Sequence, residues 1–302
     1  MLKYELFVEN LEEELRIDKF IANVYDEITR SELKYYFDEE KIFVNDKLVK
    51  PSFKVKNNDE IKIYERDEYV IDLEKENIPL NIVYEDDDVI VINKPSGLVV
   101  HPGAGHHNHT LVNALLYHCN SLSNIGGDTR AGIVHRIDKD TSGLLVCCKN
   151  NIAHRILSKE FQEKEETSRI YYAIVHGNIN HNLGKINAPI GRDPNNRQKM
   201  ACVEDGKESI THFKVLERFK DHTLIECKLE TGRTHQIRVH LAYIGHPVLN
   251  DPLYSNKTCT EFGQFLHAKT LGFVHPTNQN YLEFDSELPQ EFIDKLNELR
   301  NK

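Results

Sequence analysis

The chain has 302 residues, of which 39% are hydrophobic, and a formal net charge of −10. This length exceeds that of one typical compact domain, so we expect two domains. No run of about 18 apolar residues occurs, which predicts no membrane-spanning helix. The acidic balance argues against a broadly basic nucleic-acid-binding surface, but it does not exclude a local basic groove.

The first residues, MLKYELFVENLEEEL, are acidic and lack the basic region and apolar segment that open a signal peptide. Six cysteines are present, none of them in a C-x-x-C pair, and Cys147 and Cys148 are adjacent. This spacing suits neither a disulfide framework nor a zinc site. We therefore expect free thiols and a cytoplasmic protein.

Residues 14–66 predict a small α+β domain. The segment RIDKFIANVY has apolar residues at helical spacing: Ile17, Phe20, Ile21 and Val24. The segment TRSELKYYF follows, with Thr29 or Ser31 as a cap and one apolar face, made of Leu33, Tyr36 and Phe37. The alternation in KIFVNDKLVKP predicts a hairpin that turns at Asn45–Asp46, and KVKNNDEIKIY predicts a further turn and strand.

Half of residues 67–78 are charged, and the segment reads as a linker. From residue 79 to residue 302 the pattern changes to many short strands, with a turn at 85–88. The segment QIRVHLAYIG predicts a helix, and PQEFIDKLNELR predicts a closing helix. The fold class is therefore α+β with a mainly antiparallel sheet.

The segment HRIDKDTSG, residues 135–143, concentrates charge before the apolar run LLVCC. Asp138, Asp140, Ser142 and Gly143 match the opening of a calcium-binding EF loop, but the twelfth position is Lys149 where that loop needs Glu. The calcium interpretation therefore fails. A solvated turn and a functional site at the end of a buried strand stay open.

The segment ETGRTHQIRVH, residues 230–240, carries two arginines and two histidines. His235 and His240 are five apart, whereas a zinc pair on a helix needs a spacing of four. The segment is either a polar helix start or a site where Arg binds a carboxylate or phosphate. A further cluster lacks a matching carboxylate or Cys set and is read as a loop near RNA rather than a metal site: His101, His106, His107 and His109.

Six segments in order resemble the RluA/RluD-type RNA pseudouridine synthases across residues 79–285: NKPSGLVVHPG, HRIDKDTSGLL, RIYYAIVHG, PIGRDPNNRQKM, TGRTHQIRVHLAYIGHPVLNDPLY and LHAKTLGFVHP. Residues 16–64 resemble an S4 RNA-binding domain, although the usual Gly before the hairpin is missing and Asn58–Asp59 stands where Gly-Asp is common. Because Asn tolerates positive φ, the turn is expected to survive.

The resemblance implies a cofactor-free isomerase that converts specific uridines of structured RNA to pseudouridine. It favours large-subunit ribosomal RNA as the partner over transfer RNA. Independently of the resemblance, we expect a monomer without membrane contact. The implied fold is a pseudouridine synthase catalytic domain, mainly an antiparallel sheet, preceded by a small α+β S4-like domain.

The resemblance also implies the site residues. The essential Asp falls on Asp138, its Arg partner on Arg238 and the base-stacking Tyr on Tyr171, and we expect Asp138 and Arg238 to form a buried ion pair, with Arg233 as the competing arginine. Only one of Tyr171 and Tyr172 can face the site, because neighbouring strand residues point to opposite faces. Further substrate-binding residues are expected at Arg136, Leu266, Arg233, His235, Gln236, Lys94 and His101. RNA-binding residues of the N-terminal domain are expected at Arg16, Lys19, Thr29, Arg30, Ser31 and Lys34.

Two other functions stay open on the residues alone. A glycoside or nucleoside hydrolase also acts on a glycosidic bond but needs two carboxylates, for which Asp140 would be the second. A non-catalytic RNA-binding or ribosome-assembly protein would need no catalytic carboxylate.

Overall fold

A computed structural model describes residues 2–11, 13–25, 28, 30–65, 73–103, 105–125, 127–163, 167–255 and 259–302. The chain divides into two compact units, Met1–Leu73 with Ser123–Gly132, and Glu74–Leu122 with Ile133–Lys302. Most of the predicted linker, residues 67–72, lies outside the described residues, as does Thr29.

The first unit is a small α+β body. Its helices are α1 (Ile17–Val24) and α2 (Arg30–Asp38), and its strands are β1 (Leu2–Phe7), β2 (Leu15–Arg16), β3 (Ile42–Val44), β4 (Lys47–Leu48), β5 (Lys54–Val55) and β6 (Glu60–Tyr64). The sheet order is β1-β6-β3-β4, while β2 pairs with β5 separately. The strand β1, outside the predicted domain range of 14–66, pairs antiparallel with β6. Ser123–Gly132 contributes a short 3₁₀ helix, Asp128–Arg130.

Local sequence explains most of this unit. Leu33, Tyr36 and Phe37 of α2 are buried together with Ile17 and Ile21 of α1, as their helical spacing predicts. The hairpin between β3 and β4 turns at Asn45 and Asp46, which both have positive φ, the backbone that a two-residue hairpin requires. Asn58 also adopts positive φ, at 73°, so the expected turn forms without glycine.

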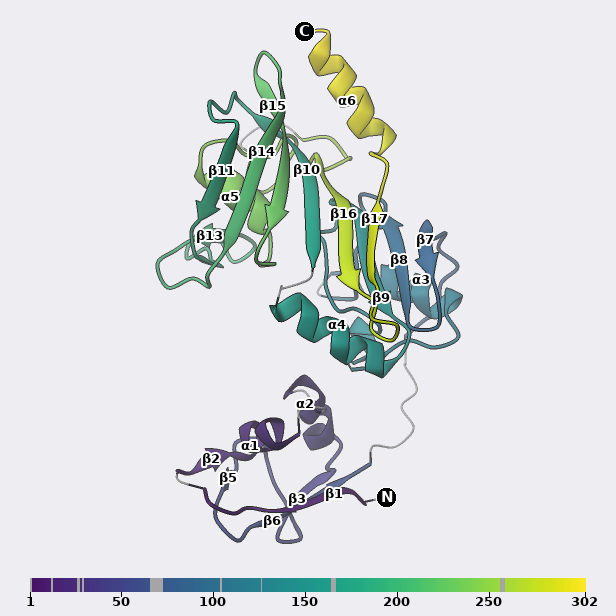
Figure 1. Ribbon diagram of the computed structural model, residues 1–302, viewed down its shortest axis with the longest axis vertical. Coiled ribbons are helices and arrows are strands. Elements are labelled where there is room, and N and C mark those ends of the chain that lie inside the picture. The colour runs from purple at the N-terminus through teal and green to yellow at the C-terminus, as the bar shows by residue number, and fades with distance from the viewer. Residues whose placement is uncertain are drawn as a thin grey trace. The chain divides into compact units, whose positions relative to one another are not determined.

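The second unit contains a mixed sheet that, within the described ranges, has nine strands in the order β11-β14-β15-β10-β16-β9-β8-β7, with β17 also paired to β16. Figure 1 shows β11 and β14 at one end of this sheet and β7 and β8 at the other. The strands are β7 (Ile82–Glu85), β8 (Val89–Lys94), β9 (Ser142–Cys148), β10 (Ser168–His176), β11 (Leu183–Asn187), β14 (Ile210–Arg218), β15 (His222–Leu229), β16 (Leu266–Val274) and β17 (Tyr281–Asp285). A small ribbon is formed by β12 (Ile190–Arg192) and β13 (Met200–Cys202).

Helices lie on both faces of this sheet. They are α3 (Leu111–His118), α4 (Asn151–Glu163), α5 (Gln236–Tyr243) and α6 (Gln290–Arg300). Ala153, Leu157 and Phe161 recur every four residues on α4 and are buried against β8, β9 and β16. Phe292 and Leu296 of α6 pack on the other face, which Ile174 of β10 also presents. Among the described residues, no helix combines the length and apolarity needed to cross a bilayer.

One parallel contact joins the two halves of the otherwise antiparallel sheet. The strand β9 pairs parallel with β16 at His267↔Ser142 and Ala268↔Gly143. Gly143 has φ of +111°, and a Cβ there would lie 2.3 Å from the backbone oxygen of Ala268. Glycine is therefore required at the end of HRIDKDTSG, because any side chain would push β9 away from β16.

We predict that Gly143→Ala lowers the free energy of unfolding by roughly 3 kcal/mol or more, because the methyl group meets backbone that cannot move aside. Gly245→Ala is the matched control, since Gly245 also has positive φ but no atom lies within 4 Å of the position that its methyl group would take. Urea unfolding followed by circular dichroism measures both. Equal losses in the two variants would show that the close approach of the strands has no energetic consequence.

Candidate active site

A cleft of about 670 Å³ opens on the sheet face that carries α4 and α5. Its floor comes from β10, β15 and β16, through Tyr171, Leu229 and Leu266. One wall is α4, and the other is the start of α5. The segment from Val134 to Thr141 closes the cleft from the side, so HRIDKDTSG and GRTHQIR meet across it although about 100 residues separate them.

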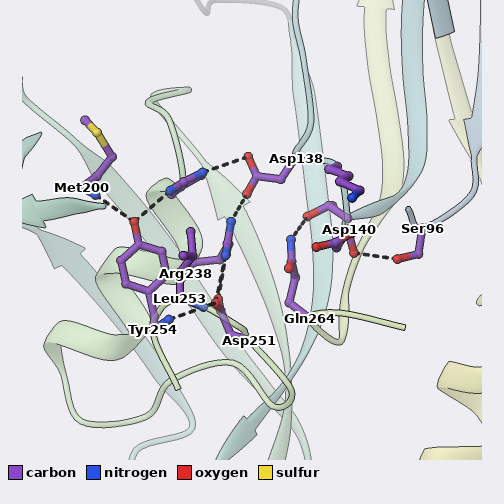
Figure 2. A network of polar contacts seen from close by, with 12 residues as sticks. Ser96, Asp138, Asp140, Met200, Arg238, Asp251, Leu253, Tyr254 and Gln264 are labelled. Atoms are coloured by element: carbon purple, nitrogen blue, oxygen red, sulfur yellow. Dashed lines mark hydrogen bonds and ion pairs between the residues drawn. The ribbon is translucent and has the colours of Figure 1, made fainter. Parts of the chain in front are cut away.

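Arg238 connects two carboxylates in this cleft (Figure 2). Its Nη1 donates to Asp138 Oδ2 at 2.8 Å. Its Nε and Nη2 donate to the two oxygens of Asp251 at 2.7 and 2.9 Å, which is the bidentate geometry that fixes a guanidinium plane. The structure therefore contains the expected ion pair and adds a second carboxylate behind it.

The two carboxylates differ in exposure. The side chain of Asp251 is fully buried, whereas that of Asp138 is 20% exposed and faces the cleft. Asp251 also accepts backbone N–H groups of Leu253 and Tyr254, so its charge is well compensated. Burial acts against the charge of Arg238, but hydrogen bonds and charges from Asp251 and Asp138 raise the pKa of the guanidinium. Arg238 is thus a fixed cation.

Tyr254 and His235 complete the surroundings of this pair. The guanidinium carbon of Arg238 lies 5.1 Å from the centre of the Tyr254 ring. The Tyr254 hydroxyl pairs with His235 Nδ1 at 2.8 Å and accepts the backbone N–H of Met200. Burial lowers the pKa of His235, and His235 Nε2 lies 3.8 Å from Asp138 Oδ1. A neutral imidazole is therefore held beside the exposed carboxylate.

Lys94 supports the loop that carries Asp138. Its ammonium is completely buried and donates to three carbonyl oxygens, of Pro95, Leu98 and Lys139, at 2.7 to 2.9 Å. Burial lowers its pKa to about 7, against the opposing charges of Asp140 and Asp138. These bonds join NKPSGL to the residue after Asp138, so Lys94 is a positioning residue rather than part of the cleft lining.

The rest of the motif is also held by hydrogen bonds. Thr141 Oγ1 accepts from Gln264, and Ser142 Oγ pairs with His267 Nδ1 at 2.8 Å. The backbone oxygen of Asp140 accepts from Ser96 Oγ. Figure 2 shows Asp140 on the side of Gln264 and Ser96, while Asp138 lies on the side of Arg238. The acidic side chains of the motif therefore have separate surroundings.

Tyr171 and Tyr172 face opposite sides of the sheet. Tyr171 is 8% exposed and lines the cleft, whereas Tyr172 packs against the cluster around α6. Burial raises the pKa of the Tyr171 phenol, which stays protonated at neutral pH. The cleft thus holds an aromatic ring and a carboxylate.

The cleft brings together most of the predicted catalytic and substrate-binding residues: Asp138, Arg238, Tyr171, Arg136, Leu266, Arg233, His235 and Gln236. The Gln236 amide is occupied, since it accepts from Thr231 and the Arg233 N–H and donates to Ile210 and Thr211. Lys94 and His101 are not among the residues that line the cleft. His101 instead pairs with Arg136 Nη1 at 2.7 Å.

The predicted RNA-binding residues lie in the first unit. Lys19 and Lys34 are exposed on α1 and α2. Arg16 is half-exposed and pairs with Asp18, with both contacts at 3.0 Å. Thr29 and the side chains of Arg30 and Ser31 lie outside what the structure describes.

Asp251 and Tyr254 are functional-site residues that no sequence pattern indicated. Both belong to NDPLY, which formed part of a motif but had no assigned role. An aspartate followed by proline is a common loop signal, and nothing local distinguishes a capping aspartate from a partner of a distant arginine.

One group of described residues outside the cleft has the spacing of a metal site. Ligand atoms of Asp86, Asp88 and His275 lie within 4.8 Å of one another. His275 Nε2 already pairs with Asp86 Oδ2 at 2.7 Å, and the other Asp86 oxygen accepts two backbone N–H groups. These contacts join the turn between β7 and β8 to the residue that follows β16, and Asp88 accepts a hydrogen bond from Asn150.

Comparison with known proteins identifies the family of this chain. Residues 88–243 match the RNA pseudouridylate synthase family. The chain is 48% identical over 286 residues to the "Uncharacterized RNA pseudouridine synthase YlyB" of Bacillus subtilis (strain 168), covering 94% of each chain. It is 44% identical over 302 residues to the "Ribosomal large subunit pseudouridine synthase D" of Zymomonas mobilis, covering 91% of each.

A solved structure, "Human RNA Pseudouridylate Synthase Domain Containing 1", is similar with a TM-score of 0.57 and 26% identity, covering 74% of this chain and 96% of that one. The matches span both the cleft motifs and the sheet that carries them. The chain therefore belongs to the RNA pseudouridylate synthase family, is of the RluA/RluD type, and is an isomerase.

Proposed function

We propose that this isomerase converts specific uridines of large-subunit ribosomal RNA to pseudouridine, with Asp138 as the essential carboxylate and without a cofactor. The substrate class is supported by relatives at 42 to 44% identity that are named ribosomal large subunit pseudouridine synthase D. The catalytic role of Asp138 is supported by the cleft itself.

The observation that carries the proposal is the acidic content of the cleft. Among the described residues that line it, Asp138 is the one carboxylate. A glycoside or nucleoside hydrolase of the usual kind needs two carboxylates, one as acid and one as base or nucleophile. Asp140, the candidate for the second, is not part of the described lining, so isomerisation with a single carboxylate is favoured over hydrolysis.

The chemistry needs few groups. The bond between N1 of uracil and C1′ of ribose breaks, the base turns, and a bond forms between C5 and C1′. C5 loses its proton and N1 gains one, so there is no net oxidation and no water is consumed. The ionised Asp138 supplies negative charge where the glycosidic bond breaks. Arg238 keeps that carboxylate oriented through its hydrogen bond.

Tyr171 and Leu266 provide the surface for the base. Both line the cleft beside Asp138, and a phenol ring and an aliphatic side chain can enclose a flat uracil. A uridine in structured RNA must first leave its stack, which costs a few kcal/mol. Stacking on Tyr171 offsets part of that cost.

The first unit supplies RNA affinity in this proposal. Its exposed Lys19 and Lys34 can neutralise phosphates although the formal net charge of the whole chain is −10. Catalysis and general RNA binding are thereby assigned to different units.

We predict that Asp138→Asn abolishes pseudouridine formation and leaves the melting temperature nearly unchanged, because the amide oxygen can still accept from Arg238. Asp140→Asn is the matched control and should retain most activity. Tritium release from ribosomal RNA labelled at uridine C5 measures turnover, and mapping of pseudouridines in cells with wild-type or Asp138→Asn protein identifies the target. Turnover by folded Asp138→Asn protein would contradict the assignment of Asp138 as the essential carboxylate. Release of free uracil by the wild-type protein would instead indicate a hydrolase.

A second prediction concerns the first unit. Replacing Lys19 and Lys34 together by Gln should weaken binding to substrate RNA and lower the slope of log Kd against log salt by about 1.5, at about 0.7 to 0.9 for each phosphate that is no longer neutralised. The rate at saturating RNA should not change. Lys54→Gln, in the same unit but paired with Glu14 at 3.1 Å, is the control. An unchanged salt slope in the double variant would contradict the assignment.

A further inference from the structure

Arg169 is a buried cation that the reaction described above does not use. It lies on β10 two residues before Tyr171, on the same face, and lines the cleft although its residue is only 8% exposed. Its Nε has no hydrogen-bond partner, and no carboxylate pairs with its guanidinium in the part of the chain that the structure describes. By contrast, Arg238 in the same cleft has two carboxylates.

Among the described residues, the neighbours of Arg169 compensate its charge only in part. The Phe161 ring lies 5.7 Å from the guanidinium carbon, a cation–π contact. His135 stacks on Phe161, and burial together with the charge of Arg169 lowers the pKa of His135 to about 3, so the imidazole is neutral. One aromatic face compensates much less than the hydration that a buried guanidinium loses. The guanidinium therefore has unmet hydrogen-bonding capacity.

The turn before α5 leaves room for this side chain. A Cβ on Gly232 would lie 2.7 Å from Arg169 Nη1, so the guanidinium reaches the backbone of that turn. The next residue, Arg233, also lines the cleft, as does Arg136 of HRIDKDTSG. Among the described residues, the cleft therefore carries more cationic than anionic groups. The single carboxylate that lines it, Asp138, is already paired with Arg238.

We propose that Arg169 binds a phosphate of the RNA backbone next to the target uridine. Two residues along a strand span about 6.6 Å, so a nucleotide stacked on Tyr171 brings its sugar–phosphate chain within reach of Arg169. A phosphate accepts two N–H donors from one guanidinium and supplies the missing negative charge, whereas a uracil carbonyl supplies only a dipole. The inference rests on the proposed function for its RNA substrate, and it adds a specific anchor within the cleft.

The test combines a protein variant with a neutral phosphate analogue. Synthetic RNA stem-loops contain the mapped uridine and one uncharged methylphosphonate linkage, placed 5′ or 3′ of it. Wild-type affinity should fall about 10-fold or more at one of these positions, as for the loss of a charge-assisted hydrogen bond. Arg169→Met should bind unmodified RNA more weakly than wild type by the same factor, and the methylphosphonate at that linkage should weaken its binding no further. Its slope of log Kd against log salt should be lower by about 0.7 to 0.9.

Further variants separate binding from a role in packing. Arg169→Met should melt at or above the wild-type temperature, because it removes a buried charge that has no carboxylate partner among the described residues. Arg169→Lys should retain most of the salt slope. Arg300→Met, which removes a half-exposed arginine paired with Glu217 outside the cleft, should match wild type in RNA affinity.

Several results would overturn the inference. A phosphate partner would be excluded if the affinity losses caused by Arg169→Met and by the methylphosphonate were additive at both linkages. It would also be excluded if Arg169→Met melted well below wild type. The same holds if the affinity loss caused by Arg169→Met disappeared only when the uracil carbonyls were replaced by thiocarbonyls. If the wild-type protein forms pseudouridine and the losses are additive, only the inference fails. If the wild-type protein neither binds nor modifies RNA, the proposed function fails as well.

Discussion

The bidentate pair between Arg238 and Asp251 is the interaction on which the cleft depends. Asp251 is fully buried, and its two bonds with Arg238, at 2.7 and 2.9 Å, fix the guanidinium plane. The remaining nitrogen then points at Asp138, 2.8 Å away. Three segments are thereby joined: the start of α5, the loop after it, and HRIDKDTSG. The orientation of Asp138, the catalytic carboxylate of our proposal, therefore depends through Arg238 on the buried Asp251.

This arrangement divides the charges of the cleft by task. Arg238 is occupied by two acids, and Lys94 is occupied by three backbone oxygens, so both hold protein rather than substrate. Asp138 is left as the anion that faces the cleft, and arginines on the surrounding segments face it as well. A chain with a net charge of −10 can thus present a locally basic cleft. Acidic side chains more than about 8 to 10 Å from the cleft do not weaken this local field, because physiological salt screens their charge.

Local elements were predictable because their causes are local. Helical spacing in RIDKFIANVY, the Asn45–Asp46 turn and the closing helix all appear as expected. The pairing of Asp138 with Arg238 was expected only through family resemblance, since no local pattern joins residues 100 positions apart. The role of Asp251 was missed for the same reason. Gly143 shows the limit most clearly: the lack of room for a Cβ arises from Ala268, on a strand that pairs parallel with its own. Lys94 was expected at the substrate, but its burial depends on the meeting of two distant loops.

The most direct test of the role of Arg238 compares Arg238→Met with Arg233→Met by urea unfolding and by turnover on the same RNA. Arg238 has two carboxylate partners, whereas Arg233 donates from Nε to the backbone oxygen of Glu208 at 3.1 Å. Losing Arg238 removes the ion-pair partner of the buried Asp251, so we expect stability to fall by about 3 to 5 kcal/mol and turnover to be lost. Arg233→Met should stay near wild type in stability and lose mainly RNA affinity. If Arg238→Met keeps wild-type stability and turnover while Arg233→Met loses both, Arg233 and not Arg238 is the arginine on which the site depends.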